Sequence, residues 1–286
     1  MRMDIPGLDM LTSDPKQATG GGAWRAAAFP ASAAWWTGKR LVMTEVSEHS
    51  EKMSGAGPVD LNTMCATAAW QALMGVTEFT LYYSVRDRDE ATYKKYCDYV
   101  GRLNAILRFA QPVYDVALYY PITELQEEYI PMAVPLDLRL MSQKTKDLVR
   151  EFEESGQQLL QHQIPFVLSG KSTETLNKAA MLFVKTTTDV RKISSDRLTS
   201  ISPENSWIML GRFERDGRDI IMLVNTGEEV YDGAIRIPDE KNPRNWHILD
   251  PETGEISSVS KGSSNKLVAV KLQPKQALFY VCERAW

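Results

Sequence analysis

A glutamate at the end of an apolar run is the residue of this sequence best placed to do chemistry. Glu45 follows Leu41-Val42-Met43-Thr44, a run too short for a helix, with the turn-prone Thr37-Gly38 before it and a polar segment after it. Such a run predicts a strand buried on both faces. Parallel sheets and (β/α) barrels carry their chemistry where such strands end. Glu45 is therefore a catalytic carboxylate or a solvated strand-end glutamate, and the residues alone favour neither.

Cleavage of a glycosidic bond is the reaction that such a carboxylate would serve. It needs two carboxyl groups, one to protonate the leaving oxygen and one to attack the anomeric carbon or activate water. Glu45 would be the nucleophile or the base, and the separation of the two carboxyls would decide between them, at about 5–5.5 Å for retention and about 6.5–9.5 Å for inversion.

Two further residues of the N-terminal region are candidates for binding a sugar. Asp9 lies in the predicted loop Pro6–Met10, where it could bind a sugar hydroxyl or cap the following turn, and we favour the cap. Trp36 could stack on a sugar ring. It follows Trp35 on a predicted helix, where neighbours point about 100° apart, so we expect at least one of the pair in the core.

Three more candidates lie in segments that follow predicted strands. His49 comes four residues after Glu45 and could line a pocket, although a surface position is the favoured alternative. Tyr82 and Tyr83 end the next strand, which should lie beside the Glu45 strand. Strand alternation points one tyrosine inward and the other outward.

The elements that would position these residues alternate between strand and helix over residues 1–110. Strands are predicted at Met1–Ile5, Lys39–Glu45 and Val76–Tyr83, and helices at Ala26–Trp36, Leu61–Met74 and Glu90–Phe109. Asp60 and Asp89 are predicted to cap the last two helices, and Gly75 to end the first of these two. The alternation predicts parallel strands joined by right-handed crossovers.

Two further regions follow, for which we expect the boundaries 111–200 and 201–286. The first is predicted to be a small α/β domain. Its predicted strands are Asp115–Pro121, Ile164–Leu168 and Met181–Val184, and its predicted helices are Lys144–Gln161 and Thr173–Ala180. The second has many short strands with turn signals, among them Asp216-Gly217 between two apolar runs, a strong hairpin signal. This pattern predicts an antiparallel β-sandwich.

The composition limits the possible partners. The chain has 286 residues, of which 43% are hydrophobic and 24% charged, which is typical of a soluble globular protein. Its formal net charge of −4 gives no electrostatic reason to expect binding to nucleic acid or an anionic membrane, and no apolar run is long enough to span a bilayer. The three cysteines are far apart and lack metal-ligand spacing, so we expect packing residues and assign no metal or cofactor.

Several stretches, in order, resemble segments of large multidomain glycoside hydrolases. Asp4–Leu11 resembles the segment after barrel strand six, Ser32–Lys39 running into Val42–Glu45 resembles the junction of a helix with strand seven, and Gly75–Ser84 resembles strand eight. Val116–Ile122 with Gln163–Phe166 looks like the α/β domain after the barrel, and Asn225–Gly227 with Trp246–Gly254 is similar to the C-terminal β-sandwich. The nearest family is the α-L-rhamnosidases of glycoside hydrolase family 106, with the barrel β-galactosidases of family 42 more distant.

This resemblance implies a fold and an activity. The fold would be α/β plus all-β: the last strands of a (β/α)8 barrel, a small Rossmann-like α/β domain and a C-terminal antiparallel β-sandwich. Glu45 would be one of two catalytic carboxylates in an enzyme that cleaves terminal glycosides such as α-L-rhamnosides, in the periplasm or outside the cell. Only two or three barrel strands precede Gln111, so the second carboxylate would belong to a missing N-terminal part of the same polypeptide, and this chain alone would be inactive. The alternative is a non-catalytic carbohydrate-binding or interaction module.

Overall fold

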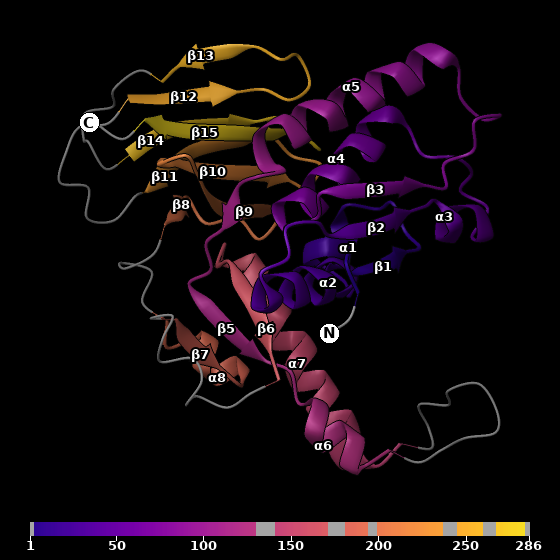
Figure 1. Cartoon of the computed structure of the whole chain (residues 1–286), viewed down its shortest axis with the longest axis vertical. Helices are drawn as coiled ribbons and strands as arrows, with labels where there is room; N and C mark the ends of the chain where they lie inside the picture. Colours follow the sequence, from indigo (N-terminus) through magenta and orange to yellow (C-terminus); the bar gives the residue numbers. More distant parts are fainter. Residues whose placement is uncertain are drawn as a thin grey trace.

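The computed structural model of the protein consists of three parts that pack against one another (Figure 1). The structure describes residues 3–129, 141–170, 181–193, 199–236, 245–259 and 267–283. Two parts contain a parallel sheet with helices, and the third contains two antiparallel sheets. The predicted fold class, α/β plus all-β, is confirmed at this level, whereas the closed barrel and the domain boundaries stay predictions.

The N-terminal part is built on a parallel sheet of three short strands in the order β1 (Gly7–Met10), β2 (Met43–Val46) and β3 (Glu78–Leu81). Helices α1 (Lys16–Thr19) and α2 (Trp24–Thr37) lie between β1 and β2 in the chain. Helices α3 (His49–Met53) and α4 (Leu61–Leu73) connect β2 to β3, and α5 (Glu90–Leu107) follows β3. The predicted parallel order is confirmed for these strands.

The predicted helix caps of this part are confirmed. The carboxylates of Asp60 and Asp89 accept hydrogen bonds from the backbone N–H groups of Thr63 and Thr92, each at 2.7 Å, at the starts of α4 and α5. Gly75 follows α4 with φ at +106°, a conformation that L side chains rarely adopt. The caps therefore fix where each helix begins and where α4 gives way to β3.

The first strand lies later in the chain than the sequence predicted. The strand predicted at Met1–Ile5 is wrong for the part of it that the structure describes, and Gly7–Met10, predicted as a loop, forms β1 instead. A Cβ on Gly7 would lie 2.8 Å from the carbonyl oxygen of Met43, so the glycine read as a loop residue is what lets β1 approach β2 closely. As a result Asp9 lies within a strand.

The second part is a smaller α/β unit with β5 (Val116–Tyr119) between β6 (Phe166–Ser169) and β7 (Leu182–Val184), all parallel. Helices α6 (Ile122–Glu127) and α7 (Gln143–Gln161) lie between β5 and β6 in the chain, and α8 (Thr187–Val190) follows β7. The helix predicted at Thr173–Ala180 lies outside the described residues.

The third part is antiparallel. Its larger sheet contains β4 (Gln111–Pro112), β9 (Ile208–Arg215), β10 (Arg218–Asn225), β12 (Asn245–Leu249), β13 (Ile256–Ser258) and β15 (Ala277–Glu283). Its smaller sheet contains β8 (Ser200–Ser202), β11 (Tyr231–Arg236) and β14 (Leu267–Leu272). Asp216 and Gly217 join β9 to β10 with φ values of +51° and +75°, which confirms the predicted two-residue hairpin turn.

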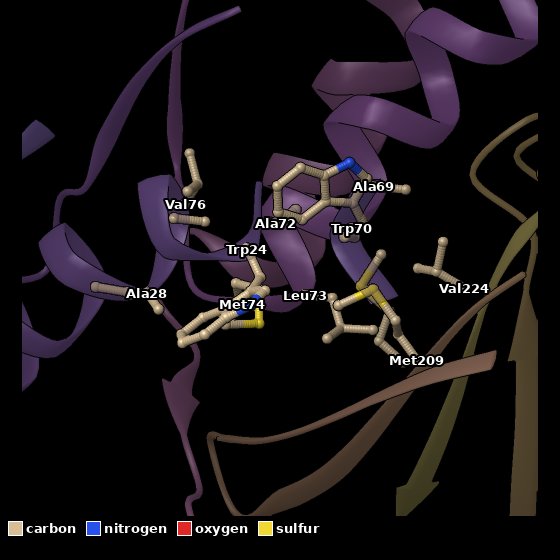
Figure 2. Packing of buried hydrophobic residues seen from close by; sticks show 14 of the residues in the cluster. Trp24, Ala28, Ala69, Trp70, Ala72, Leu73, Met74, Val76, Met209 and Val224 are labelled. Carbon is tan, nitrogen blue, oxygen red and sulfur yellow. The ribbon is translucent and has the colours of Figure 1, made fainter. Parts of the chain in front are cut away.

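Strands β9 and β10 of the larger antiparallel sheet are largely buried on both faces, and one hydrophobic cluster joins the three parts. Leu210 and Leu223 face the smaller sheet, whereas Met209 and Val224 belong to the cluster that includes helix α4. Figure 2 shows Leu73 of α4 beside Met209. Burial on both sides explains why β10 contains the uninterrupted apolar run Ile220–Val224 rather than an alternating pattern. None of the described helices combines the length and apolar character needed to cross a membrane.

Candidate functional site

Asp9 and Glu45 lie side by side on one face of the N-terminal sheet. The strand register pairs Asp9 with Glu45 and Glu45 with Thr80. Neighbouring strands are about 4.8 Å apart and residues in register point to the same face. The opposite face meets the helices, because the Thr44 hydroxyl donates to Gln71 of α4 at 2.5 Å. Glu45, the next residue, therefore points to the uncovered face of the sheet.

Asp9 influences the ionisation of Glu45. A hydrogen bond with Asp9 raises the pKa of Glu45, and burial and the charge of Asp9 act in the same direction. Glu45 is half-buried and Asp9 exposed. Neighbouring carboxyls of which one keeps its proton can supply both an acid and a base to one substrate. Within the described residues, no group of three or more His, Cys, Asp or Glu side chains lies together as a metal ion would require.

The loops that follow the three strands form a rim at the carboxyl ends of the sheet, and Ser13 and Tyr83 connect them. The Ser13 hydroxyl donates to the carbonyl of Ser47 at 2.9 Å and lies 2.7 Å from the Tyr83 hydroxyl. Tyr83 is 4% exposed, whereas Tyr82 is 61% exposed. One tyrosine points inward and one outward, as strand alternation predicts, and the inward one holds the loops together.

A buried ion pair between Glu48 and Arg88 also fixes this rim. The two side chains are 1% and 5% exposed, and the guanidinium donates to both carboxylate oxygens. Arg88 also donates to the carbonyl of Val59 at 2.7 Å, and its guanidinium carbon lies 5.3 Å from the centre of the Tyr83 ring. Burial alone would raise the pKa of Glu48, but the hydrogen bonds from Arg88, the Val59 N–H and Lys52 outweigh it and lower the pKa to about 2. The pair therefore holds the loop after β2 against the loop after β3.

Two of the predicted site residues lie elsewhere than beside Glu45. Trp36 is in the last turn of α2, at the end of the sheet where β2 begins, and its indole N–H donates to the carbonyl of Leu168 in β6 at 2.7 Å. It therefore connects the first two parts of the protein. His49 is exposed and begins α3, immediately after the buried Glu48. The structure thus brings Asp9 to Glu45, and it places Trp36 at the opposite end of the sheet.

Comparisons with known proteins give a likeness of fold. No protein-family model matches the sequence, and no curated protein matches it. A rhamnosidase from Novosphingobium sp. PP1Y superposes with a TM-score of 0.57 at 13% identity, over 99% of this chain and 35% of the other. A β-galactosidase from Bacillus circulans sp. alkalophilus gives a TM-score of 0.47 at 9% identity, over 90% of this chain and 62% of the other. A family 42 β-galactosidase from G. stearothermophilus gives 0.44 at 9% identity, over 79% and 51%.

The superposition on the rhamnosidase confirms, at the level of fold, the resemblance found in the sequence. Sequence identities this low show a shared fold and nothing finer. The chain spans about a third of the length of the rhamnosidase that it matches.

Proposed function

We propose that this chain supplies the last strands of a glycoside hydrolase barrel and that Glu45 is one of the two catalytic carboxylates. The observation that carries the proposal is the in-register pair of Asp9 and Glu45 on the uncovered face of a parallel sheet. This face corresponds to the interior of a barrel, because the helices lie on the other side. The likeness to the rhamnosidase over nearly the whole chain supports the same assignment.

The other barrel strands would come from an N-terminal part of the same polypeptide. Within the described residues, β1 and β3 each have a strand partner on one side alone, and barrel closure would pair both edges. Leu8 of β1 is 44% exposed, whereas its register neighbour Thr44, on the same face, is fully buried by helices. A further strand and helix beside β1 would cover Leu8 and bring the second carboxyl group.

The residues at the carboxyl ends of the three strands would together bind and cleave a terminal sugar. Glu45 attacks the anomeric carbon or activates water, depending on its separation from the second carboxyl. Asp9 holds a sugar hydroxyl. It also raises the pKa of Glu45, so Glu45 becomes ionised, and able to attack or to accept a proton, only at a higher pH than an ordinary glutamate. Tyr82 and His49 are exposed after their strands and would line the entrance. α-L-Rhamnosides are the substrate class we propose, on the likeness to the rhamnosidase.

The DNA upstream of Met1 tests the proposed architecture. The proposal predicts an open frame in phase with Met1 that encodes further strand–helix repeats and another strand-end Glu or Asp. An in-phase stop codon just before Met1 would contradict it and would favour a non-catalytic carbohydrate-binding module.

A further inference from the structure

A hollow opens in the small α/β part, on a different sheet from Glu45. It has a volume of about 740 Å³ and lies at the carboxyl ends of β5 and β7, beside the first half of α7. β5 lies between β6 and β7 although β6 follows it in the chain, so the strand order reverses at β5. In open parallel sheets, ligands bind beyond the carboxyl ends of the strands at such a reversal.

An ammonium group is held in place at this hollow. The Lys185 nitrogen lies 5.1 Å from the centre of the Tyr119 ring, within the range of a cation–π contact. The Tyr119 hydroxyl is fixed in turn by the Glu124 carboxylate, with its two oxygens at 2.8 and 2.7 Å. Lys185 forms no ion pair with any residue in the part of the chain that the structure describes. The lysine is exposed, and although its charge acts on the Glu124 carboxylate, no carboxylate of the described residues forms an ion pair with it.

The carboxylates that line the hollow already have partners. Glu151 accepts hydrogen bonds from the backbone N–H of Thr187 at 2.6 Å and from its hydroxyl at 3.0 Å. Asp147 pairs with Arg150 at 2.6 Å. Both carboxylates keep their charges, but the lining also carries three cations, Lys144, Arg150 and Lys185. Lys144 pairs with Glu128 and Arg150 with Asp147, so Lys185 is the lining cation most open to an incoming anion among the described residues.

We propose that this hollow binds a carboxylated sugar, a hexuronic acid residue of a glycan, through its carboxylate on Lys185. A sugar fits better than a bare anion because the lining also offers the Tyr119 ring, Pro121 and the Thr188 side chain, which suit the apolar face and the hydroxyls of a pyranose. The site lies on another sheet and works without Glu45, so it does not rest on the proposed catalytic function. It would hold an acidic glycan whether or not the chain takes part in cleavage.

Calorimetric titration of the 286-residue chain with D-glucuronic acid and with D-glucose tests the site, since the two sugars differ in the group at C6. We expect saturable binding of glucuronic acid and about tenfold weaker binding of glucose, because a charge-assisted hydrogen bond is lost. Lys185→Met should weaken the binding of glucuronic acid by about tenfold and leave the binding of glucose unchanged. Lys185→Arg should keep most of the affinity, and because Lys185 is exposed, both variants should fold.

Two matched variants complete the experiment. Lys192→Met removes another exposed lysine of the same unit, which pairs with Asp189 at 3.7 Å outside the hollow, and should bind like the parent chain. Glu45→Gln should also bind like the parent. Equal affinity for the two sugars, no saturation, no effect of Lys185→Met, or loss of binding in Glu45→Gln would each overturn the proposal.

Discussion

The buried ion pair between Glu48 and Arg88 should make a large contribution to the free energy of unfolding. Its carboxylate, Glu48, has its pKa lowered from 4.5 to about 2 by hydrogen bonds from Arg88, the Val59 N–H and Lys52, against the opposing effect of burial. That lowering corresponds to about 3 kcal/mol of folding free energy that is present only while Glu48 is ionised. Replacement of Glu48 by glutamine should therefore cost about 3 kcal/mol at pH 7, because it leaves the buried guanidinium without its counter-charge.

The sign of the pH dependence follows from the direction of the shift. Above about pH 4.5 Glu48 is ionised in both states and contributes fully. As the pH falls towards 2, the unfolded chain takes up a proton that the folded chain does not, so the contribution is lost. Below about pH 2 Glu48 becomes protonated in the folded chain as well, and a protonated glutamate and a glutamine have nearly the same shape and charge. The difference in stability between the parent and Glu48→Gln should therefore shrink from about 3 kcal/mol to near zero between pH 4.5 and pH 2.

Urea denaturation followed by tryptophan fluorescence at several pH values measures this difference. Asp98→Asn is the matched control, because Asp98 pairs with Lys94 on the surface, with 46% of its side chain exposed, and such pairs contribute about 0.5 kcal/mol or less. A loss below about 1 kcal/mol in Glu48→Gln at pH 7, or a loss that stays constant as the pH falls, would refute the reasoning.

Two further predictions concern the carboxyl pair and helix packing. Asp9→Asn should lower the pKa of Glu45 because it removes the hydrogen bond and the charge that raise it, and carbon-13 NMR titration of the glutamate carboxyls measures this; an unchanged midpoint would contradict the pairing. Gly156→Ala should cost about 1–3 kcal/mol in urea denaturation, since its Cβ would lie 2.4 Å from the Trp24 ring. Gly101→Ala, in the interior of α5 with nothing within 4 Å of the added Cβ, should instead stabilise the chain by about 0.5–1 kcal/mol, and equal effects of the two changes would contradict the packing.

Local signals predicted much of the fold because the residues that carry them act on their immediate neighbours. Asp60 and Asp89 cap helices three residues away, and Asp216-Gly217 closes a hairpin between adjacent strands. Pro6-Gly7 was misread as a loop for the opposite reason. The demand for glycine at position 7 comes from Met43, a residue of another strand that the local sequence does not reveal.

The site shows the same division between local and distant information. The position of Glu45 near a strand end follows from its own flanks. Asp9 was also a candidate from the sequence, but only the register of β1 with β2 places it beside Glu45. The sequence offered no sign of the Glu48–Arg88 pair, because 40 residues separate the two and neither lies in a periodic element. The end of the sheet at which Trp36 lies depends on the direction of α2, which runs back to the start of β2. The residue type of Trp36, an aromatic side chain, does not show at which end of the sheet it lies.

The most direct test of the central claim is the hydrolysis of p-nitrophenyl α-L-rhamnopyranoside by the polypeptide that the complete reading frame encodes, with Glu45→Gln compared against Glu255→Gln. Glu255 is exposed just before β13 of the antiparallel part and is the matched control. The account predicts a fall in kcat/KM of at least about a thousandfold for Glu45→Gln, or about 4 kcal/mol of transition-state stabilisation, and no change for Glu255→Gln. Activity in Glu45→Gln within about threefold of the parent would contradict the assignment of Glu45 as a catalytic carboxylate.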